Sequence, residues 1–140
     1  MVTVSTTPTA AAPPGDGKIL PSVPESARAA RHLVSLTLRA WGLNDLVEVA
    51  TLIVSELVAN SIDHTPCRLL RVGVSRPSPC VVRVGVADRS RVLPEVGTPA
   101  ADIEQGRGLV LIDALSWRWG SDCHGWGKLV WADLRVEEPV

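Results

Sequence analysis

The sequence predicts an α+β fold, a two-layer α/β sandwich with a mixed, mainly antiparallel sheet and about three helices on one face. Apolar residues recur with helical spacing from about residue 22 to residue 64, which indicates two successive helices. After Pro66 the apolar period changes to two, as in strands, and a third helical stretch precedes a second pair of strands. Helices and antiparallel strands segregated in this way are typical of two packed layers.

Length and composition indicate one domain with its own hydrophobic core. The chain has 140 residues, of which 46% are hydrophobic, so global disorder is not expected. The formal net charge of -1 gives no reason to expect nucleic acid or a membrane surface as a partner. The three cysteines lack C-x-x-C spacing and predict neither a disulfide framework nor a zinc site. Without a long apolar stretch or a signal-peptide pattern, the sequence favours a cytoplasmic protein outside the membrane.

The chain is expected to open with a tail and then a helix. Residues 1–17 are rich in Thr, Ala, Pro and Gly, which predicts a flexible tail, and residues 18–140 are predicted to form the folded domain. Ser22 and Glu25 have the spacing of a capping box, which predicts a helix start there. Gly42 is a natural end for this helix.

A second helix and a pair of strands follow. The helix is predicted to begin near Asn44 or Asp45, either of which can cap it, and to end before Pro66. Alternating apolar residues then predict strands over residues 68–75 and 81–88, with a turn-like segment between them.

The rest of the chain is predicted to be a loop, a helix and a hairpin. Residues 89–105 form an irregular stretch that is long for a compact domain, and loops of this length often bind ligands. Residues 106–115 read as a helix opened by glycine, and residues 116–136 as a β-hairpin with glycine in its turn.

Polar residues form a stripe on the second predicted helix. Glu56, Asn60 and His64 recur every four residues in an otherwise apolar stretch, so they share one side of the helix. Two interpretations are open, because the stripe is either the solvated edge of an amphipathic helix or a surface that faces a ligand. His64 also fits a stabilising position near the negative end of the helix dipole.

Two further polar groups also have ordinary structural interpretations when taken alone. Asp88 closes the second predicted strand, where an Asp is usually a turn residue. The glycines that open the third helix also serve ordinary tight turns. They belong to the run Gly106, Arg107 and Gly108.

Together these groups could supply the parts of a nucleotide site. A carboxylate such as Glu56 can deprotonate an attacking hydroxyl, and the amide oxygen of Asn60 suits Mg²⁺. Asp88 can accept a hydrogen bond from the amino group of adenine. Backbone N–H groups at a glycine-rich helix start suit phosphate.

Three segments resemble those of a known family. "LIVSELVANSIDHT", "VGVADRS" and "GRGLVLIDAL" resemble the N box and the two glycine boxes of the histidine-kinase-like (Bergerat) ATPases. The small size, "PESARAAR" and "RWGSDCHGWGKLVWADL" resemble, more narrowly, the single-domain anti-sigma-factor serine/threonine kinases. The resemblance covers roughly residues 19–136.

The resemblance implies a role for each residue of the three segments. Glu56 corresponds to the catalytic base, Asn60 to the magnesium ligand, and Asp88 to the residue that reads adenine. The segment 89–105 would be the ATP lid. The residues implied to contact the phosphates are Gly106, Arg107 and Gly108.

The sequence departs from the family pattern in two places. The segment after Asp88 reads Arg-Ser-Arg and lacks the glycines usual in the first glycine box. Leu129 stands where many members have a Thr near the adenine. A leucine supplies no hydroxyl, so adenine recognition would depend more heavily on Asp88.

The function implied is that of an ATP-binding, Mg²⁺-dependent serine/threonine kinase of the anti-sigma-factor type. Such a protein would phosphorylate an antagonist of the anti-sigma factor, sequester a sigma factor, or do both, and its relatives commonly form homodimers. The alternative is a non-catalytic interaction module that binds ATP structurally or not at all. A third interpretation is an α+β domain in which the three motifs coincide by chance.

Overall fold

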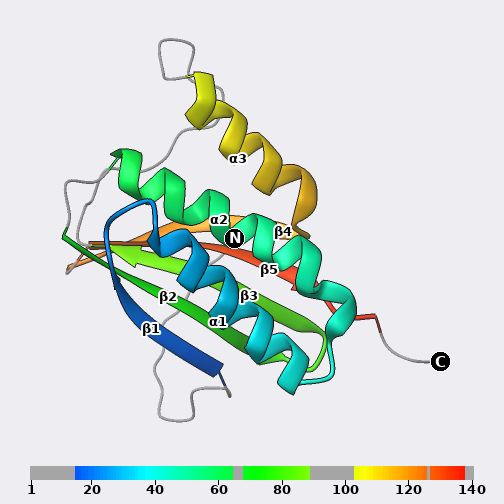
Figure 1. Ribbon diagram of the computed structural model, residues 1–140. Helices are drawn as coiled ribbons and strands as arrows, with labels where there is room; N and C mark the ends of the chain where they lie inside the picture. Colours follow the sequence, from blue (N-terminus) through cyan, green and yellow to red (C-terminus); the bar gives the residue numbers. More distant parts are fainter. Residues whose placement is uncertain (1–14, 65–67, 89–102, 126, 138–140) are drawn as a thin grey trace.

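A computed structural model describes residues 15–64, 68–88, 103–125 and 127–137 of the chain. These ranges hold three α-helices, one short 3₁₀ helix and five strands (Figure 1). In chain order the elements are β1 (Gly15–Pro21), α1 (Ser26–Ala40), η1 (Asn44–Leu46), α2 (Val47–His64), β2 (Leu69–Ser78), β3 (Val81–Asp88), α3 (Ile103–Leu115), β4 (Arg118–His124) and β5 (Gly127–Arg135).

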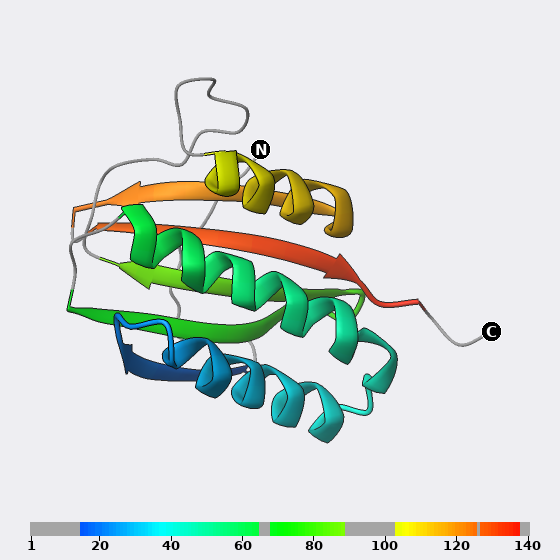
Figure 2. The same ribbon diagram turned by 45° about the horizontal axis from the view of Figure 1, so that its top comes forward.

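The predicted α+β architecture is confirmed, with one correction. The strands form a single sheet in the order β1-β2-β3-β5-β4, and the three α-helices lie side by side over one of its faces (Figure 2). Every neighbouring pair of strands is antiparallel, so the prediction of a mixed sheet was wrong for the described strands. The pairs β2–β3 and β4–β5 are hairpins, and such short connections require antiparallel strands because a parallel neighbour needs a long crossover.

The hydrophobic core lies between the helices and the sheet, as the spacing of apolar residues in the sequence predicts. Alternate residues of β3, namely Val82, Val84 and Val86, are buried on the helix-facing side, as the period of two predicts. On α2 the buried apolar residues have helical spacing. They are Ala50, Ile53, Val54, Leu57 and Val58.

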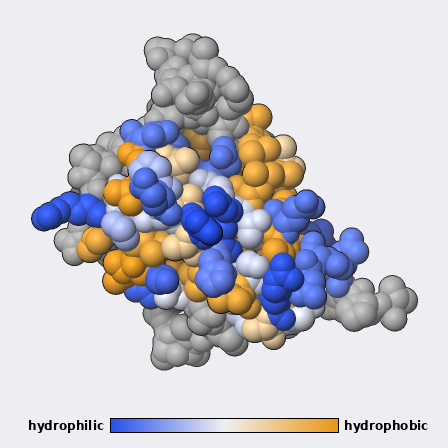
Figure 3. All heavy atoms as spheres, viewed as in Figure 1, coloured by the Kyte–Doolittle hydropathy of each residue, from blue (hydrophilic) through white to orange (hydrophobic). Residues whose placement is uncertain are grey.

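The outer surface of the helix layer is mixed in character. Hydrophilic and hydrophobic residues are interspersed over much of it, and hydrophobic residues gather at the upper right, where α3 lies (Figure 3). Leu36 and Leu52 are apolar side chains exposed at 54% and 43%. None of the helices in the described part of the chain is both long and apolar enough to cross a bilayer.

The start of the domain differs from the prediction. Strand β1 begins at Gly15, inside the segment predicted to be tail, and pairs along its whole length with β2. Helix α1 begins at Ser26, and Glu25 at its N-cap makes no side-chain cap. The backbone N–H of Ser22 instead donates to the carbonyl of Arg68 at 2.8 Å, which ties this residue to the start of β2. The predicted capping box is therefore absent.

The boundaries of α2 are close to the prediction, whereas the end of β2 and the start of α3 differ from it. Helix α2 follows the turn at Asn44–Leu46 and ends at His64, ahead of Pro66. Strand β2 continues three residues beyond the predicted end, to Ser78. Helix α3 begins at Ile103, three residues before the predicted start. Most of the predicted lid, residues 89–102, lies outside the described residues.

A row of glycines crosses the outer face of the sheet, the face turned away from the helices. Gly17 pairs with Gly73, Gly73 with Gly85, Gly85 with Trp131, and Trp131 with Gly120. Directly opposed residues point to the same face, so Trp131 is the large side chain in this row. Its indole lies over Gly120, where a Cβ atom would be 2.8 Å from Cζ2.

We expect Gly120→Ala to destabilise the protein by about 1–3 kcal/mol, because the added methyl group must displace the Trp131 ring. Urea unfolding followed by tryptophan fluorescence measures the change. Gly125→Ala is the matched control, since no atom lies within 4 Å of a Cβ at that position. Equal stability of the two variants would contradict this account of the glycine row.

Candidate functional site

Helix α2 carries the two predicted residues of the N box. Asn60 is 6% exposed, and Glu56, one helical turn earlier, is half-buried. Helix α2 packs on β3 and β5 and lies between α1 and α3 (Figure 2). Of the two interpretations of the polar stripe, a purely solvated edge does not describe Asn60, because its side chain is inside the sandwich.

The amide oxygen of Asn60 is an unsatisfied acceptor. Oδ1 is buried, and no hydrogen-bond donor in the described part of the chain reaches it. A buried polar atom without a partner costs about 1–3 kcal/mol, so such atoms are uncommon in folded proteins. An amide oxygen is also a hard ligand of the kind that Mg²⁺ takes. Asn60 therefore fits the metal-binding role that the sequence predicts for it.

Asp88 lies at the end of β3 on the face that the helices cover. It is 4% exposed and continues the buried row of valines along the strand. The hydroxyl of Ser61 donates a hydrogen bond of 2.6 Å to Oδ2 of Asp88. Since Ser61 is the next residue after Asn60, this bond brings the predicted magnesium ligand and the predicted adenine-reading residue to the same end of the sandwich.

Ser61 was missed by the sequence analysis. The sequence shows only a serine beside Asn60 in an apolar helix. That pattern does not distinguish a serine with a buried hydrogen bond from an exposed one. The partner of Ser61 is 27 residues away in the sequence, so only the packing of α2 on β3 reveals the pair.

Lys128 is a second residue that the sequence analysis did not identify. It is fully buried and lies directly opposite Asp88 on β5. Opposed residues in an antiparallel pair share a face, so Lys128 also points into the space between sheet and helices. A buried lysine therefore belongs to the same polar cluster as Asn60, Ser61 and Asp88.

The predicted position of Leu129 near the adenine is not borne out. Side chains alternate along a strand, so Leu129 points to the face opposite that of Lys128 and Asp88. Its Cδ1 atom lies 3.0 Å from the place that a Cβ on Gly85 would occupy, on the outer face. The residue of β5 that faces the helices at this point is Lys128.

The predicted phosphate-binding residues lie within α3. Helix α3 packs against α2, and it begins at Ile103, so its second turn contains them rather than its first residue. Their side chains lie outside the described part of the structure, as does that of His64 at the end of α2. Their proposed contact with phosphate stays a prediction. The residues concerned are Gly106, Arg107 and Gly108.

The structure was also searched for hollows and for groups of metal-binding side chains. An open surface depression of ≈ 740 Å³ lies along α1, with Thr51 of α2 at its edge, and neither Asn60 nor Asp88 lines it. Within the described ranges no three His, Cys, Asp or Glu side chains gather into a metal-binding group. The depression is lined by Glu25, Arg28, Ala29, Arg31, His32, Ser35 and Thr51.

Comparison with known proteins does not assign the chain to a family. No protein-family model matches it, and a search of curated proteins finds no relative. The resemblance to the histidine-kinase-like ATPases therefore stays a prediction based on three short segments. The function has to be inferred from the residues of the site.

We expect Ser61→Ala to lower the free energy of unfolding by about 1–3 kcal/mol, because it removes a hydrogen bond to a buried carboxylate. Ser55→Ala is the control on the same helix, where the hydroxyl donates to the carbonyl of Thr51 at 2.9 Å on a more exposed side. Urea unfolding of both variants measures the difference. If Ser61→Ala is as stable as Ser55→Ala, the contact with Asp88 does not hold α2 on the sheet.

Proposed function

We propose that this protein binds Mg·ATP between α2 and the adjoining ends of β3 and β5, in the manner of the Bergerat ATPases. The observation that carries the proposal is the buried, unpartnered Oδ1 atom of Asn60. A bound cation would give this oxygen the partner that the described residues do not provide. The proximity of Asp88, through the bond from Ser61, supports a site that binds more than a metal ion.

Asp88 is suited to recognise an amino group such as that of adenine. A carboxylate has about four acceptor sites, so one that accepts a bond from a serine hydroxyl can also accept one from an amino group. The same bond also fixes the orientation of the carboxylate before any ligand arrives. A pre-oriented acceptor in a buried place discriminates well between bases with and without a donor at that position.

Asn60 and Glu56 divide the remaining chemistry. Asn60 would hold Mg²⁺, which when bound neutralises charge on the phosphates of the nucleotide. Glu56 is half-buried and makes no hydrogen bond or ion pair with the other described residues. An uncommitted carboxylate one turn from the metal ligand can accept the proton of an attacking serine or threonine hydroxyl.

On this basis we propose a serine/threonine protein kinase of the anti-sigma-factor type. The protein substrate would be an antagonist of the anti-sigma factor, and a sigma factor would be the protein that is sequestered. From the family resemblance we also propose that the protein forms a homodimer. Its proposed location is the cytoplasm.

A second candidate is a module that sequesters a partner and needs no ATP turnover. Lys128 favours it, because a buried ammonium group opposite Asp88 is a cation built into the site itself. Such a residue could compensate the charge of Asp88 in the absence of nucleotide. The two candidates differ in whether Mg·ATP binds and whether Glu56 is required.

We expect Asn60→Leu to abolish Mg²⁺-dependent ATP binding while leaving the protein as stable as the wild type, within about 1 kcal/mol. Leucine has a similar size, and it removes an unsatisfied oxygen rather than a hydrogen bond. Calorimetric titration with ATP, with and without Mg²⁺, measures affinity, and urea unfolding measures stability.

Glu48→Gln, which changes an exposed residue at the start of the same helix, is the matched control for this experiment. Wild-type protein that binds no Mg·ATP would contradict the proposed nucleotide site and favour the second candidate. A large loss of stability in Asn60→Leu would mean that Asn60 has a structural role instead.

We expect Glu56→Gln to slow phosphoryl transfer about 10²–10⁴-fold, the usual contribution of a general base. ATP affinity should change little, because the residue acts on the attacking hydroxyl and not on the nucleotide. Transfer of labelled γ-phosphate to an array of serine and threonine peptides measures the rate, and Glu48→Gln is again the control. If the Glu56→Gln variant transfers phosphate at the wild-type rate, Glu56 is not the base.

A further inference from the structure

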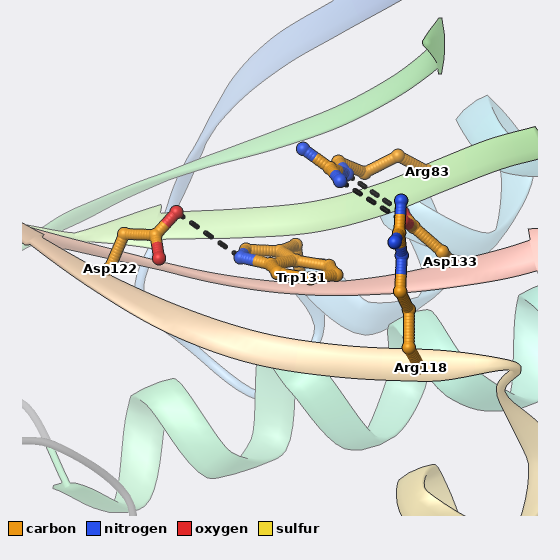
Figure 4. Close-up of polar contacts among 5 residues, drawn as sticks. All are labelled: Arg83, Arg118, Asp122, Trp131 and Asp133. Atoms are coloured by element: carbon orange, nitrogen blue, oxygen red, sulfur yellow. Dashed lines mark hydrogen bonds and ion pairs between the residues drawn. The ribbon is translucent and has the colours of Figure 1, made fainter. Parts of the chain in front are cut away.

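The outer face of the sheet carries an organised group of charged and aromatic side chains at its β4–β5 edge. This arginine–tryptophan cluster lies on the face opposite the three helices, so it is separate from the candidate nucleotide site. Figure 4 shows part of it at close range. The cluster consists of Arg83, Arg118, Arg135, Trp117, Trp131 and Asp133.

Asp133 is the centre of the cluster. Its carboxylate is fully buried and accepts two hydrogen bonds from Arg83, at 2.7 Å from Nε and 3.0 Å from Nη2. Arg118 donates a third, from Nε to Oδ2 at 2.9 Å (Figure 4). Three bonds from two planar donors fix the direction of both guanidinium groups.

Each of the three arginines lies over a tryptophan ring. Arg83 lies over the ring of Trp131 at 4.2 Å. Arg118 and Arg135 both lie over Trp117, at 4.5 and 5.1 Å from the ring centre. These distances are within the range of cation–π attraction. The cations are therefore organised before any partner arrives, which lowers the entropy cost of binding.

The cluster presents more positive than negative charge to the solvent. It contains three guanidinium groups and the single carboxylate of Asp133, which is buried beneath them. The side chain of Arg118 is 49% exposed, and its two Nη atoms make no hydrogen bond within the described ranges. The carboxylate of Asp122 lies on the same face and accepts a bond of 3.2 Å from the indole of Trp131, so three guanidinium groups stand against two carboxylates there.

Trp117 is the exposed apolar part of the cluster. It is 47% exposed, although its backbone N–H is anchored to the carbonyl of Asp133 at 2.8 Å. Tryptophan and arginine are both enriched among the residues that dominate protein–protein binding. Arginine also recognises carboxylates through paired hydrogen bonds.

We propose that the arginine–tryptophan cluster is a docking surface for an acidic segment of a partner protein. Carboxylates of the partner would pair with the outward guanidinium groups of Arg118 and Arg135, and an apolar side chain would cover Trp117. Complementary charge is the reason for choosing an acidic segment. The proposal does not depend on nucleotide binding, because the cluster and Asn60 lie on opposite sides of the sheet.

A protein partner fits the cluster better than nucleic acid does. Binding along a phosphate backbone requires positive charge spread over an extended surface. Here three arginines gather around one buried carboxylate, and the chain as a whole has a net charge of -1.

The test uses the full chain and fluorescently labelled poly-L-glutamate as the acidic probe, with binding followed by anisotropy. We expect Arg135→Gln and Arg118→Gln each to weaken binding about two- to fivefold, the range for exposed ion pairs, and binding to weaken as salt is added. Arg39→Gln, at an exposed position on α1, is the matched control and should bind as the wild type does.

Arg135→Gln keeps the test decisive if Arg118→Gln fails to fold, because Arg135 makes no ion pair with Asp133. The proposal is overturned if the wild type does not bind poly-L-glutamate, or if Arg135→Gln binds as well as Arg39→Gln. It is also overturned if double-stranded DNA binds more tightly than poly-L-glutamate and loses affinity in the same variants, since the surface would then be a nucleic-acid site.

Discussion

The hydrogen bond from Ser61 to Asp88 is the contact on which the candidate site depends. It joins the last turn of α2 to the last residue of β3 at 2.6 Å, inside the sandwich. A short bond to a carboxylate is stronger than one between neutral groups and is directional. It therefore fixes how α2 is rotated about its axis at this end. The rotation in turn buries Asn60, the neighbour of Ser61, and leaves Glu56 at the border between core and solvent.

Strand β5 shows how one short sequence can serve two separate surfaces. Its side chains alternate, so Lys128, Val130 and Ala132 face the helices while Trp131 and Asp133 face outward. The inward side supplies core and one polar residue at the candidate site. The outward side organises arginines from β3, β4 and its own end. Shifting this strand by one residue would exchange the two sets, so the antiparallel register with β3 is a constraint shared by both surfaces.

Sequence patterns predicted the helices and strands whose apolar residues recur at a regular spacing. They failed for residues whose position depends on a partner distant in the sequence. The valines of β3 and the end of α2 before Pro66 were predicted because alternation and proline act locally. Strand β1 was missed because its glycines and single buried Leu20 carry little periodicity, and its backbone is held by β2. Lys128 and Ser61 could not be assigned, since a lysine or serine becomes a buried residue only through a partner distant in the sequence.

The distribution of buried polar groups is the strongest reason to regard the end of α2 as a functional site. Among the described residues, seven polar or charged side chains are buried. Four of them, Asn60, Ser61, Asp88 and Lys128, belong to the end of α2, the end of β3 and the start of β5. These three element ends lie at one end of the sandwich (Figure 1). The rest of the space between the layers is lined mainly by Val, Leu, Ile and Ala. An apolar side chain at Asn60 would pack in that core without a desolvation cost, so fold stability alone does not account for the amide. The proposed ligand would give this oxygen a partner, at the place where four of the seven buried polar side chains lie.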